Sequence, residues 1–156
     1  MTAPLPVEGA PSGDDPTQIT LDFLARWGVS FDAMCASFHD VMAPGCPWEQ
    51  RPMAITHGPD QAVRFLRLAR RTLGLATIVV ETPHIARVGN VVLTERIDHL
   101  LRADGTIIAS ATVAGVFEFD DGHLVRWREH FDAAGFAGQI VGRAVRRRRY
   151  VPDARG

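Results

Sequence analysis

The sequence has few cysteines, no charge imbalance and no recognisable metal-binding pattern. Its two cysteines, Cys35 and Cys46, form no CxxC pair, which excludes a disulfide scaffold and a cysteine-rich zinc module. Seventeen basic and eighteen acidic side chains give a net charge of −1. This balance argues against a nucleic-acid-binding protein, because such a protein must neutralise phosphates. The histidines show no metal-ligand spacing.

We also expect neither a secretory signal nor a membrane-spanning segment in this sequence. No basic residue precedes Arg26, so the start of the chain does not have the charged beginning of a secretory signal. The longest apolar-leaning run, residues 107–119, is too short and too rich in Ser, Thr and Gly to cross a membrane. We therefore expect a soluble cytoplasmic protein with neither a nucleic-acid nor a membrane partner.

Length and composition predict one domain with flanking segments. The chain has 156 residues, of which 46% are hydrophobic and 22% charged, as in an ordinary globular protein. Residues 1–16 contain four of the ten prolines and show no periodicity, so we expect a disordered leader there. Residues 17–142 are expected to form a single domain. Residues 143–156, with their run of arginines, are expected to form a basic C-terminal tail.

Helical periodicity and capping signals occur at three places before residue 75. The apolar spacing over residues 17–27 predicts a first helix with Gly28 as its C-cap. A second, short helix is expected over residues 30–39. A third begins at Gly58-Pro59-Asp60 and ends at Gly74. Three aromatic residues are interpreted as core residues rather than as walls of a substrate site, because core is the more common role of such side chains: Trp27, Phe65 and Phe117.

From residue 77 the pattern changes to strands. Four β-rich runs are separated by Gly-Asn and Asp-Gly pairs, which are the strongest short-range signal for hairpins. The expected strands are Thr77–Val88, Val91–Arg102, Thr106–Phe119 and His123–Phe131. The proline-rich residues 41–56 are interpreted as an irregular edge strand that carries side chains toward a pocket. Helices followed by a meander predict an α+β fold, with the helices packed on one face of a curved antiparallel sheet.

Strand alternation brings charged side chains onto faces that are otherwise apolar. Arg96 and Asp98 share one face of the second strand with Val92, Thr94 and Leu100. On the last strand, Glu129 shares a face with Val125, Trp127 and Phe131. A lone carboxylate on such a face is costly unless it is paired, and Arg96 is the natural partner. Two interpretations remain open: a structural Asp–Arg–Glu network that fixes strand register, or a general acid and a general base.

Three segments of the sequence carry a resemblance to a known family. They are Val92-Leu-Thr-Glu-Arg-Ile-Asp98, Gly115-Val-Phe-Glu-Phe-Asp-Asp-Gly122 and Trp127-Arg-Glu-His-Phe-Asp132. Together they resemble the limonene-1,2-epoxide hydrolase family, and the resemblance extends over residues 17–136. It implies a cone of the nuclear-transport-factor-2 (NTF2) type, in which three to four helices pack on the concave face of a strongly curved, antiparallel-rich sheet. It further implies a homodimer, a deep apolar pocket, and no metal or other cofactor.

The resemblance also assigns roles to five residues. Arg96 matches the family's bridging arginine, and Asp98 matches the acid that protonates the epoxide oxygen. Glu129 stands where the family has a water-activating aspartate. Trp48 and Gln50 stand where the family has a tyrosine and an asparagine that hold the water. Glu129 and Gln50 are each one methylene longer than the family's residues, and the indole of Trp48 can donate but not accept a hydrogen bond.

The function implied is hydrolysis of a small apolar epoxide to a vicinal diol, by direct attack of water. Two alternatives stay open at this point, because the same cone fold hosts several functions. One is an isomerase or cyclase that uses Asp98 or Glu129 for proton abstraction. The other is a pocket that binds an apolar ligand without chemistry. A water in contact with both Glu129 and Gln50 would favour hydrolysis.

Overall fold

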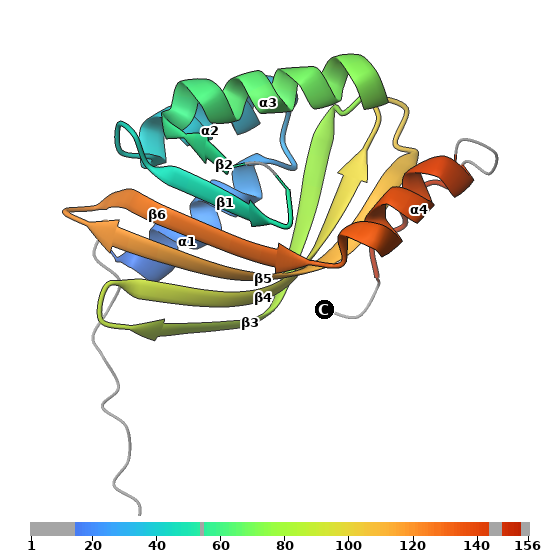
Figure 1. The fold of residues 1–156 in the computed structure, drawn as a ribbon. Helices are drawn as coiled ribbons and strands as arrows, with labels where there is room; N and C mark the ends of the chain where they lie inside the picture. Colours follow the sequence, from blue (N-terminus) through green and yellow to red (C-terminus); the bar gives the residue numbers. More distant parts are fainter. Residues whose placement is uncertain (1–14, 54, 144–147, 154–156) are drawn as a thin grey trace, which may run out of the picture.

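A computed structural model describes residues 15–53, 55–143 and 148–153 (Figure 1). In chain order the elements are α1 (Pro16–Arg26), α2 (Phe31–Val41), β1 (Pro47–Arg51), β2 (Ile55–His57), α3 (Gly58–Leu73), β3 (Thr77–Val88), β4 (Val91–Leu101), β5 (Ile107–Asp120), β6 (His123–Phe131) and α4 (Ala133–Arg143). The strands form one six-stranded sheet in the order β2-β1-β6-β5-β4-β3. All pairs are antiparallel except β1–β6, which is parallel. The α+β cone is therefore confirmed.

The structure describes only part of the two flanking segments. Most of the predicted leader lies outside the described residues, as do residues 144–147 and 154–156 of the predicted tail. Within the tail, Arg148 and Tyr150 make backbone hydrogen bonds to the start of β5 and to the turn before it: Ile107 N donates to Arg148 O, and Tyr150 N donates to Gly105 O. The division into leader, domain and tail stays a prediction.

Helix ends follow local hydrogen bonding, and one of them differs from the prediction. α1 begins at Pro16, where the Asp15 side chain accepts a hydrogen bond from Thr17 N. Gly28 was expected as the C-cap of this helix, but Trp27 is the C-cap, in right-handed geometry, so the predicted end is one residue too late. The chain tightens there instead, with Gly28 N donating to Ala25 O at 3.2 Å, so no positive φ is needed. α3 does end at a left-handed Gly74, with φ 76°.

The proline-rich stretch contains one interior strand and the beginning of an edge strand. β1 pairs with β2 on one side and with β6 on the other, so β2 is the edge. The expectation of an edge strand holds for β2, whose first two residues end the proline-rich stretch, and is wrong for β1, because Pro47 is the first residue of β1 and Pro52 follows its end. Neither proline therefore removes a donor from the interior of the ladder.

The inward face of β6 changes partway along the strand. Phe119 pairs with Leu124 and Glu118 with Arg126, so Val125 is an extra residue at a β-bulge. As a result Leu124 is buried, whereas Val125, expected on the inner face, is 37% exposed. Beyond the bulge the alternation is as predicted, and Glu129 faces the interior.

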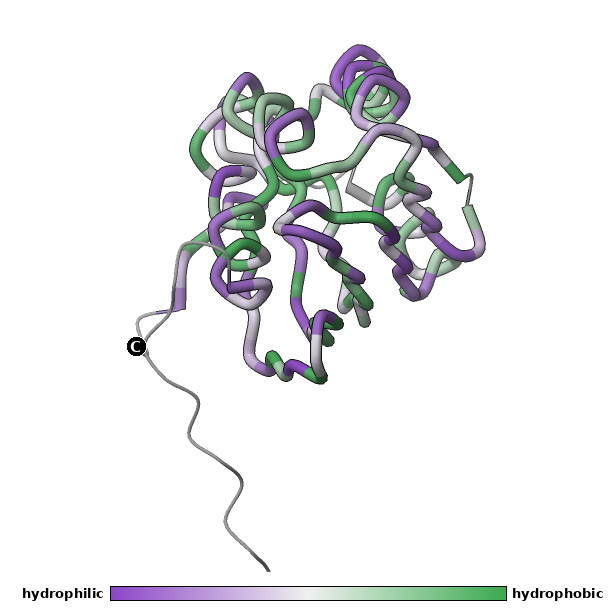
Figure 2. The backbone as a smooth tube through the Cα atoms, turned by 90° about the vertical axis from the view of Figure 1, so that its left-hand side faces the viewer, coloured by the Kyte–Doolittle hydropathy of each residue, from purple (hydrophilic) through white to green (hydrophobic). Residues whose placement is uncertain are grey.

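The core lies between the concave face of the sheet and the helices. Figure 1 shows α3 crossing above the curved sheet, and contacts join α1 to β3 and β4, α3 to β1 and β2, and α4 to β5. Hydrophilic and hydrophobic residues alternate along the elements (Figure 2), as expected where one face is buried. Indole rings dominate the centre: Trp48 stacks on Trp127 with centroids 4.5 Å apart. No helix in the described part of the chain is long and apolar enough to span a membrane.

Candidate active site

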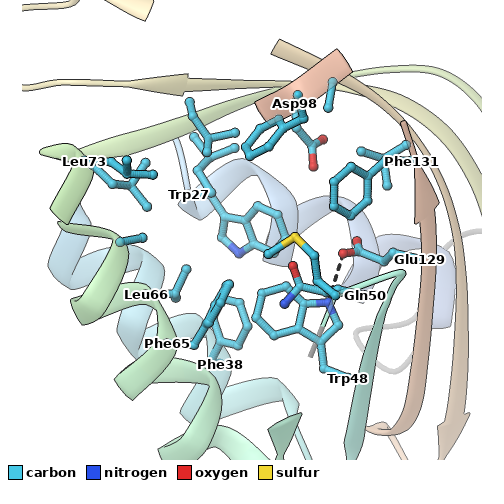
Figure 3. Close-up of a pocket in the computed structure, with 18 residues that line it drawn as sticks. Trp27, Phe38, Trp48, Gln50, Phe65, Leu66, Leu73, Asp98, Glu129 and Phe131 are labelled. Atoms are coloured by element: carbon cyan, nitrogen blue, oxygen red, sulfur yellow. Dashed lines mark hydrogen bonds between the residues drawn. The ribbon is translucent and has the colours of Figure 1, made fainter. Parts of the chain in front are cut away.

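A pocket of about 140 Å³ opens between the concave face of the sheet and the helices (Figure 3). Its walls are aromatic and aliphatic, and they come from α1, α2, α3, α4 and the sheet. Among the lining residues, the ionisable or amide side chains are Gln50, Asp98 and Glu129. A mostly apolar pocket with a few converging polar groups is the usual form of a small-molecule site.

Arg96 is the centre of the polar cluster. It is fully buried, and its Nε donates to Asp98 Oδ1 at 2.9 Å. Its Nη2 donates both to Asp98 Oδ2 at 3.2 Å and to Glu129 Oε1. The contact that strand alternation predicts, one arginine bound to both carboxylates, is therefore present. The three polar groups are brought together by two different strands, β4 and β6.

Glu129 receives a second donor from the neighbouring strand β1. The indole Nε1 of Trp48 donates to Glu129 Oε2 at 2.9 Å. The parallel pairing of β1 with β6 places Trp48 opposite Trp127 and Gln50 opposite Glu129. Each carboxylate oxygen of Glu129 therefore accepts one hydrogen bond and keeps further lone-pair capacity for a water or a substrate.

The electrostatics of Glu129 result from burial and from two charged neighbours. Its side chain is almost fully enclosed, and this burial raises the pKa of the carboxyl above its ordinary value. The guanidinium of Arg96 opposes the rise in pKa, and the hydrogen bond from Trp48 opposes it further. The charge of Asp98 reinforces it. The same two carboxylates raise the pKa of Arg96, which keeps the guanidinium charged in spite of its burial.

Gln50 completes the set of residues that the sequence predicts for the site. It is 8% exposed, and its Nε2 has no hydrogen-bond partner within the described ranges of the chain. Figure 3 shows its amide beside Glu129 and Trp48, directed into the pocket. A buried amide donor without a partner costs free energy unless a water or a ligand binds it. All five predicted residues, Trp48, Gln50, Arg96, Asp98 and Glu129, thus meet at one site.

Several lining residues were missed by sequence reasoning. Trp27 and Phe65 were interpreted as core, but both line the pocket, while Phe117 is a buried core residue as expected. Phe136 of α4 also lines the pocket. Periodicity identifies which face of a helix is buried, but it does not distinguish contact with core from contact with a cavity. Among the described residues, no group of three or more His, Cys, Asp or Glu side chains could hold a metal ion.

Comparison with known proteins places this geometry in a family. The family profile described as the limonene-1,2-epoxide hydrolase catalytic domain matches residues 25–141. The chain therefore belongs to the limonene-1,2-epoxide hydrolase family.

Individual relatives agree with this assignment. The chain is 41% identical over 69 residues to epoxide hydrolase EphG of Mycobacterium tuberculosis. That match covers 44% of this chain and 45% of the relative, so less than half of the relative's length is matched. A solved M. tuberculosis LEH-like epoxide hydrolase is similar at a TM-score of 0.65 and 25% identity, covering 83% of this chain and 92% of that one. A SnoaL-like polyketide cyclase from Jannaschia sp. CCS1 shares the fold, with a TM-score of 0.66 and 15% identity over 85% and 97% of the two chains.

Proposed function

We propose that this protein is an epoxide hydrolase that adds water to a small apolar epoxide and releases a vicinal diol. The observation that supports the proposal most directly is the fully buried Arg96, bound to both Asp98 and Glu129 at the edge of an apolar pocket. With one cation for two buried carboxylates, a single proton held between the carboxylates makes the cluster neutral and leaves one of them as an acid and the other as a base, which is the state that paired acid and base catalysis requires.

In the proposed reaction the two carboxylates act at opposite ends of the breaking bond. Glu129, ionised, takes a proton from a water whose oxygen forms a new bond to an epoxide carbon. Asp98, protonated, gives its proton to the epoxide oxygen as the carbon–oxygen bond breaks. A proton then returns from Glu129 to Asp98 before the next turnover. Each of the two proton transfers contributes about 10²–10⁴ in rate.

The water is proposed to lie between Glu129 and Gln50. The side-chain amide of Gln50 has an unpartnered donor, and it lies next to the carboxylate on the adjacent strand. Trp48 donates to Glu129 itself, so we assign it to fixing the carboxylate rather than to holding the water. Glu129 and Gln50 are each one methylene longer than the residues expected from the family resemblance, so both side chains reach further into the pocket by a similar distance. The proposed water site between them therefore stays on the same side of Arg96.

The substrate is proposed to be a small apolar epoxide, bound by the aromatic walls of the pocket. A cavity of about 140 Å³ suits a compact hydrocarbon skeleton, and the rings of Trp27, Phe65 and Phe136 offer apolar contact. We further propose that the protein acts without a metal or cofactor, as a homodimer in the cytoplasm. The free thiols of Cys35 and Cys46 are compatible with a reducing compartment. Light scattering at micromolar concentration tests the dimer: a mass near 17 kDa would contradict it.

The test is diol formation from a panel of terpene, cycloalkene and aryl epoxides, with and without a chelator, using Glu129→Gln as the matched inactive variant. With enzyme in excess and ¹⁸O-labelled water, direct attack puts the label into the diol of the first turnover. A covalent intermediate would instead give an unlabelled first diol. If no epoxide is turned over while a ketone or polyketide substrate is isomerised or cyclised, the hydrolase proposal fails in favour of the isomerase alternative.

A further inference from the structure

The contact between Arg96 and Glu129 has to cross an intervening strand. Arg96 is on β4 and Glu129 is on β6, and β5 lies between them in the sheet. Neighbouring strands are about 4.8 Å apart, so the guanidinium must pass over the backbone of β5 to reach the carboxylate. The residue at the crossing point is Gly115, which pairs with Thr94 on one side and with Glu129 on the other.

A side chain at position 115 would occupy the space that the guanidinium uses. A Cβ atom there would lie 2.7 Å from Arg96 Nη1, 2.8 Å from Thr94 Oγ1 and 3.0 Å from Phe117 Cε2. The first two separations are shorter than real Cβ contacts allow. Arg96 has little room to give way, because rings of Trp27, Phe117 and Trp127 surround its guanidinium with centroids 5.7–5.9 Å away.

Backbone geometry does not explain a glycine at this position. Gly115 is absent from the residues with positive φ, so an L-residue could adopt its conformation. The pairing of β5 with β4 and with β6 also runs through Gly115 without a register shift, so it is not a bulge. Glycine inside a strand costs free energy relative to a residue with a side chain, so what remains to explain it is the space that it leaves.

We propose that Gly115 is a positioning residue for this site: the space left by its missing side chain is the passage through which Arg96 reaches Glu129. A side chain at position 115 separates Arg96 from Glu129. It leaves the pairing with Asp98 in reach, because Asp98 is two residues away on the same strand as Arg96. The consequence for catalysis rests on the proposed function, so the primary test does not require turnover.

The test compares Gly115→Ala with Gly138→Ala. Gly138 is a matched control, because a Cβ there would meet no heavy atom within 4 Å apart from its chain neighbours and the adjoining backbone of its own helix, and its φ is not positive. The probe is the indole N–H resonance of Trp48, which donates to Glu129 and therefore reports its ionisation in a pH titration. Trp48→Phe identifies this resonance among those of the three tryptophans. The charged groups that face Glu129 are Arg96 and Asp98, both on β4.

In Gly115→Ala, the midpoint of the Trp48 titration is expected to rise by about one pH unit, because a displaced cation no longer favours the ionised carboxylate. Gly138→Ala should leave it unchanged. A midpoint in Gly115→Ala equal to that of the wild type would overturn the proposal. For the hydrolase activity, kcat/KM is expected to fall about 100-fold, the usual cost of a misplacement of about 1 Å.

A double-mutant cycle keeps the proposal testable if Gly115→Ala destabilises the protein. Lysine lacks the Nη1 atom that the new Cβ would meet, so Gly115→Ala should lower the melting temperature less in an Arg96→Lys background than in the wild type. An equal decrease in both backgrounds would overturn the proposal. If Gly115→Ala alone does not fold, recovery of a folded protein on adding Arg96→Lys supports the proposal, and failure to recover it overturns it. None of these results depends on whether an epoxide is turned over.

Discussion

The two halves of the polar cluster are built in different ways. Arg96 and Asp98 are two residues apart on one strand, so their contact follows from local strand geometry. The other half combines Trp48 and Gln50 of β1 with Glu129 of β6, and the Trp48–Glu129 hydrogen bond spans 81 residues of sequence. All three residues that differ from those expected from the family resemblance belong to this second half. By that resemblance, the local half has the expected residue types, and the half assembled by tertiary structure differs from them.

The second half of the cluster is joined to the first through the hydrogen bonds of Glu129. The carboxylate of Glu129 meets Arg96 on one oxygen and Trp48 on the other. An indole offers one fixed donor, so the carboxylate must reach it, and the longer side chain of Glu129 supplies that reach. We therefore interpret the three replacements as one coordinated change. The predictions below test this interpretation, from the largest expected effect to the smallest.

The largest effect is expected from changing proton chemistry in either half. Glu129→Gln and Asp98→Asn keep side-chain shape but remove the base and the acid, so each should lower kcat for diol formation by about 10³-fold or more. Circular dichroism and thermal unfolding should show an intact fold in both variants. A variant that retained full activity would remove its residue from the proposed mechanism.

Removing the cation that joins the two halves should affect both activity and stability. Arg96→Ala leaves two carboxylates close together in a buried site, and we expect activity to be lost and unfolding free energy to fall by about 3–5 kcal/mol. Urea unfolding at pH 7 measures the loss. The double variant Arg96→Ala/Asp98→Asn has one carboxylate fewer and should recover part of that free energy. If it were no more stable than Arg96→Ala, charge crowding would not be the cause.

Shortening the changed half tests whether its replacements act together. In Glu129→Asp with Gln50→Asn the carboxylate retreats by about 1 Å from Arg96 and Trp48, and kcat/KM should fall about 100-fold. Adding Trp48→Tyr should recover part of the loss, because a hydroxyl can bind the water directly. Steady-state kinetics of the single, double and triple variants give the kcat/KM values that test these expectations. Higher activity in the double variant than in the wild type would show that the replacements had impaired the site.

A smaller effect is expected from removing the indole donor alone. Trp48→Phe retains a ring stacked on Trp127 but removes the hydrogen bond to Glu129, so the activity should fall about tenfold, since a hydrogen bond to a charged group contributes about 1.5 kcal/mol. Trp127→Phe is a matched control, because the indole nitrogen of Trp127 has no partner among the residues described and Trp127 does not line the pocket. Equal losses in both variants would indicate a general packing effect instead.

The smallest effect is a pH dependence of stability that originates in Glu129. Its pKa is raised in the folded protein, above the ordinary value of 4.5. Between the two pKa values the folded state binds more protons than the unfolded state, so this contribution to stability is present below pH 4.5 and is lost as the pH rises. Urea unfolding across this range should show the wild type losing stability relative to Glu129→Gln. A constant difference between the two would contradict the raised pKa.

Much of the fold follows from the sequence because its signals are local. The glycine-containing turns and alternating runs predict β3 to β6 to within a residue or so at each end. Features that depend on tertiary context were missed. The bulge at Val125 reverses one position of the alternation, and the central place of β1 arises from its pairing with β6, far away in sequence.

The candidate site shows the same division. Arg96 and Asp98 are evident from alternation on a single strand, and Glu129 follows from the cost of a lone buried carboxylate. Alternation does not reveal that Trp48 donates to Glu129 rather than to a water, because that depends on parallel pairing between β1 and β6. Alternation also does not explain the glycine at position 115. That Arg96 crosses β5 at this residue is evident only from the order of the strands in the sheet.

The parallel β1–β6 pair also has a consequence for how the protein folds. The β3–β6 meander consists of hairpins that close over short loops, whereas β1 must find β6 across about half of the chain. We expect the meander, with Arg96 and Asp98 already in contact, to form before β1 docks. At that stage Glu129 is at an open sheet edge and is still hydrated. In this order the carboxylate is enclosed only when β1 docks, so that step creates the environment that raises its pKa, and chains that stop short of it do not assemble the candidate site.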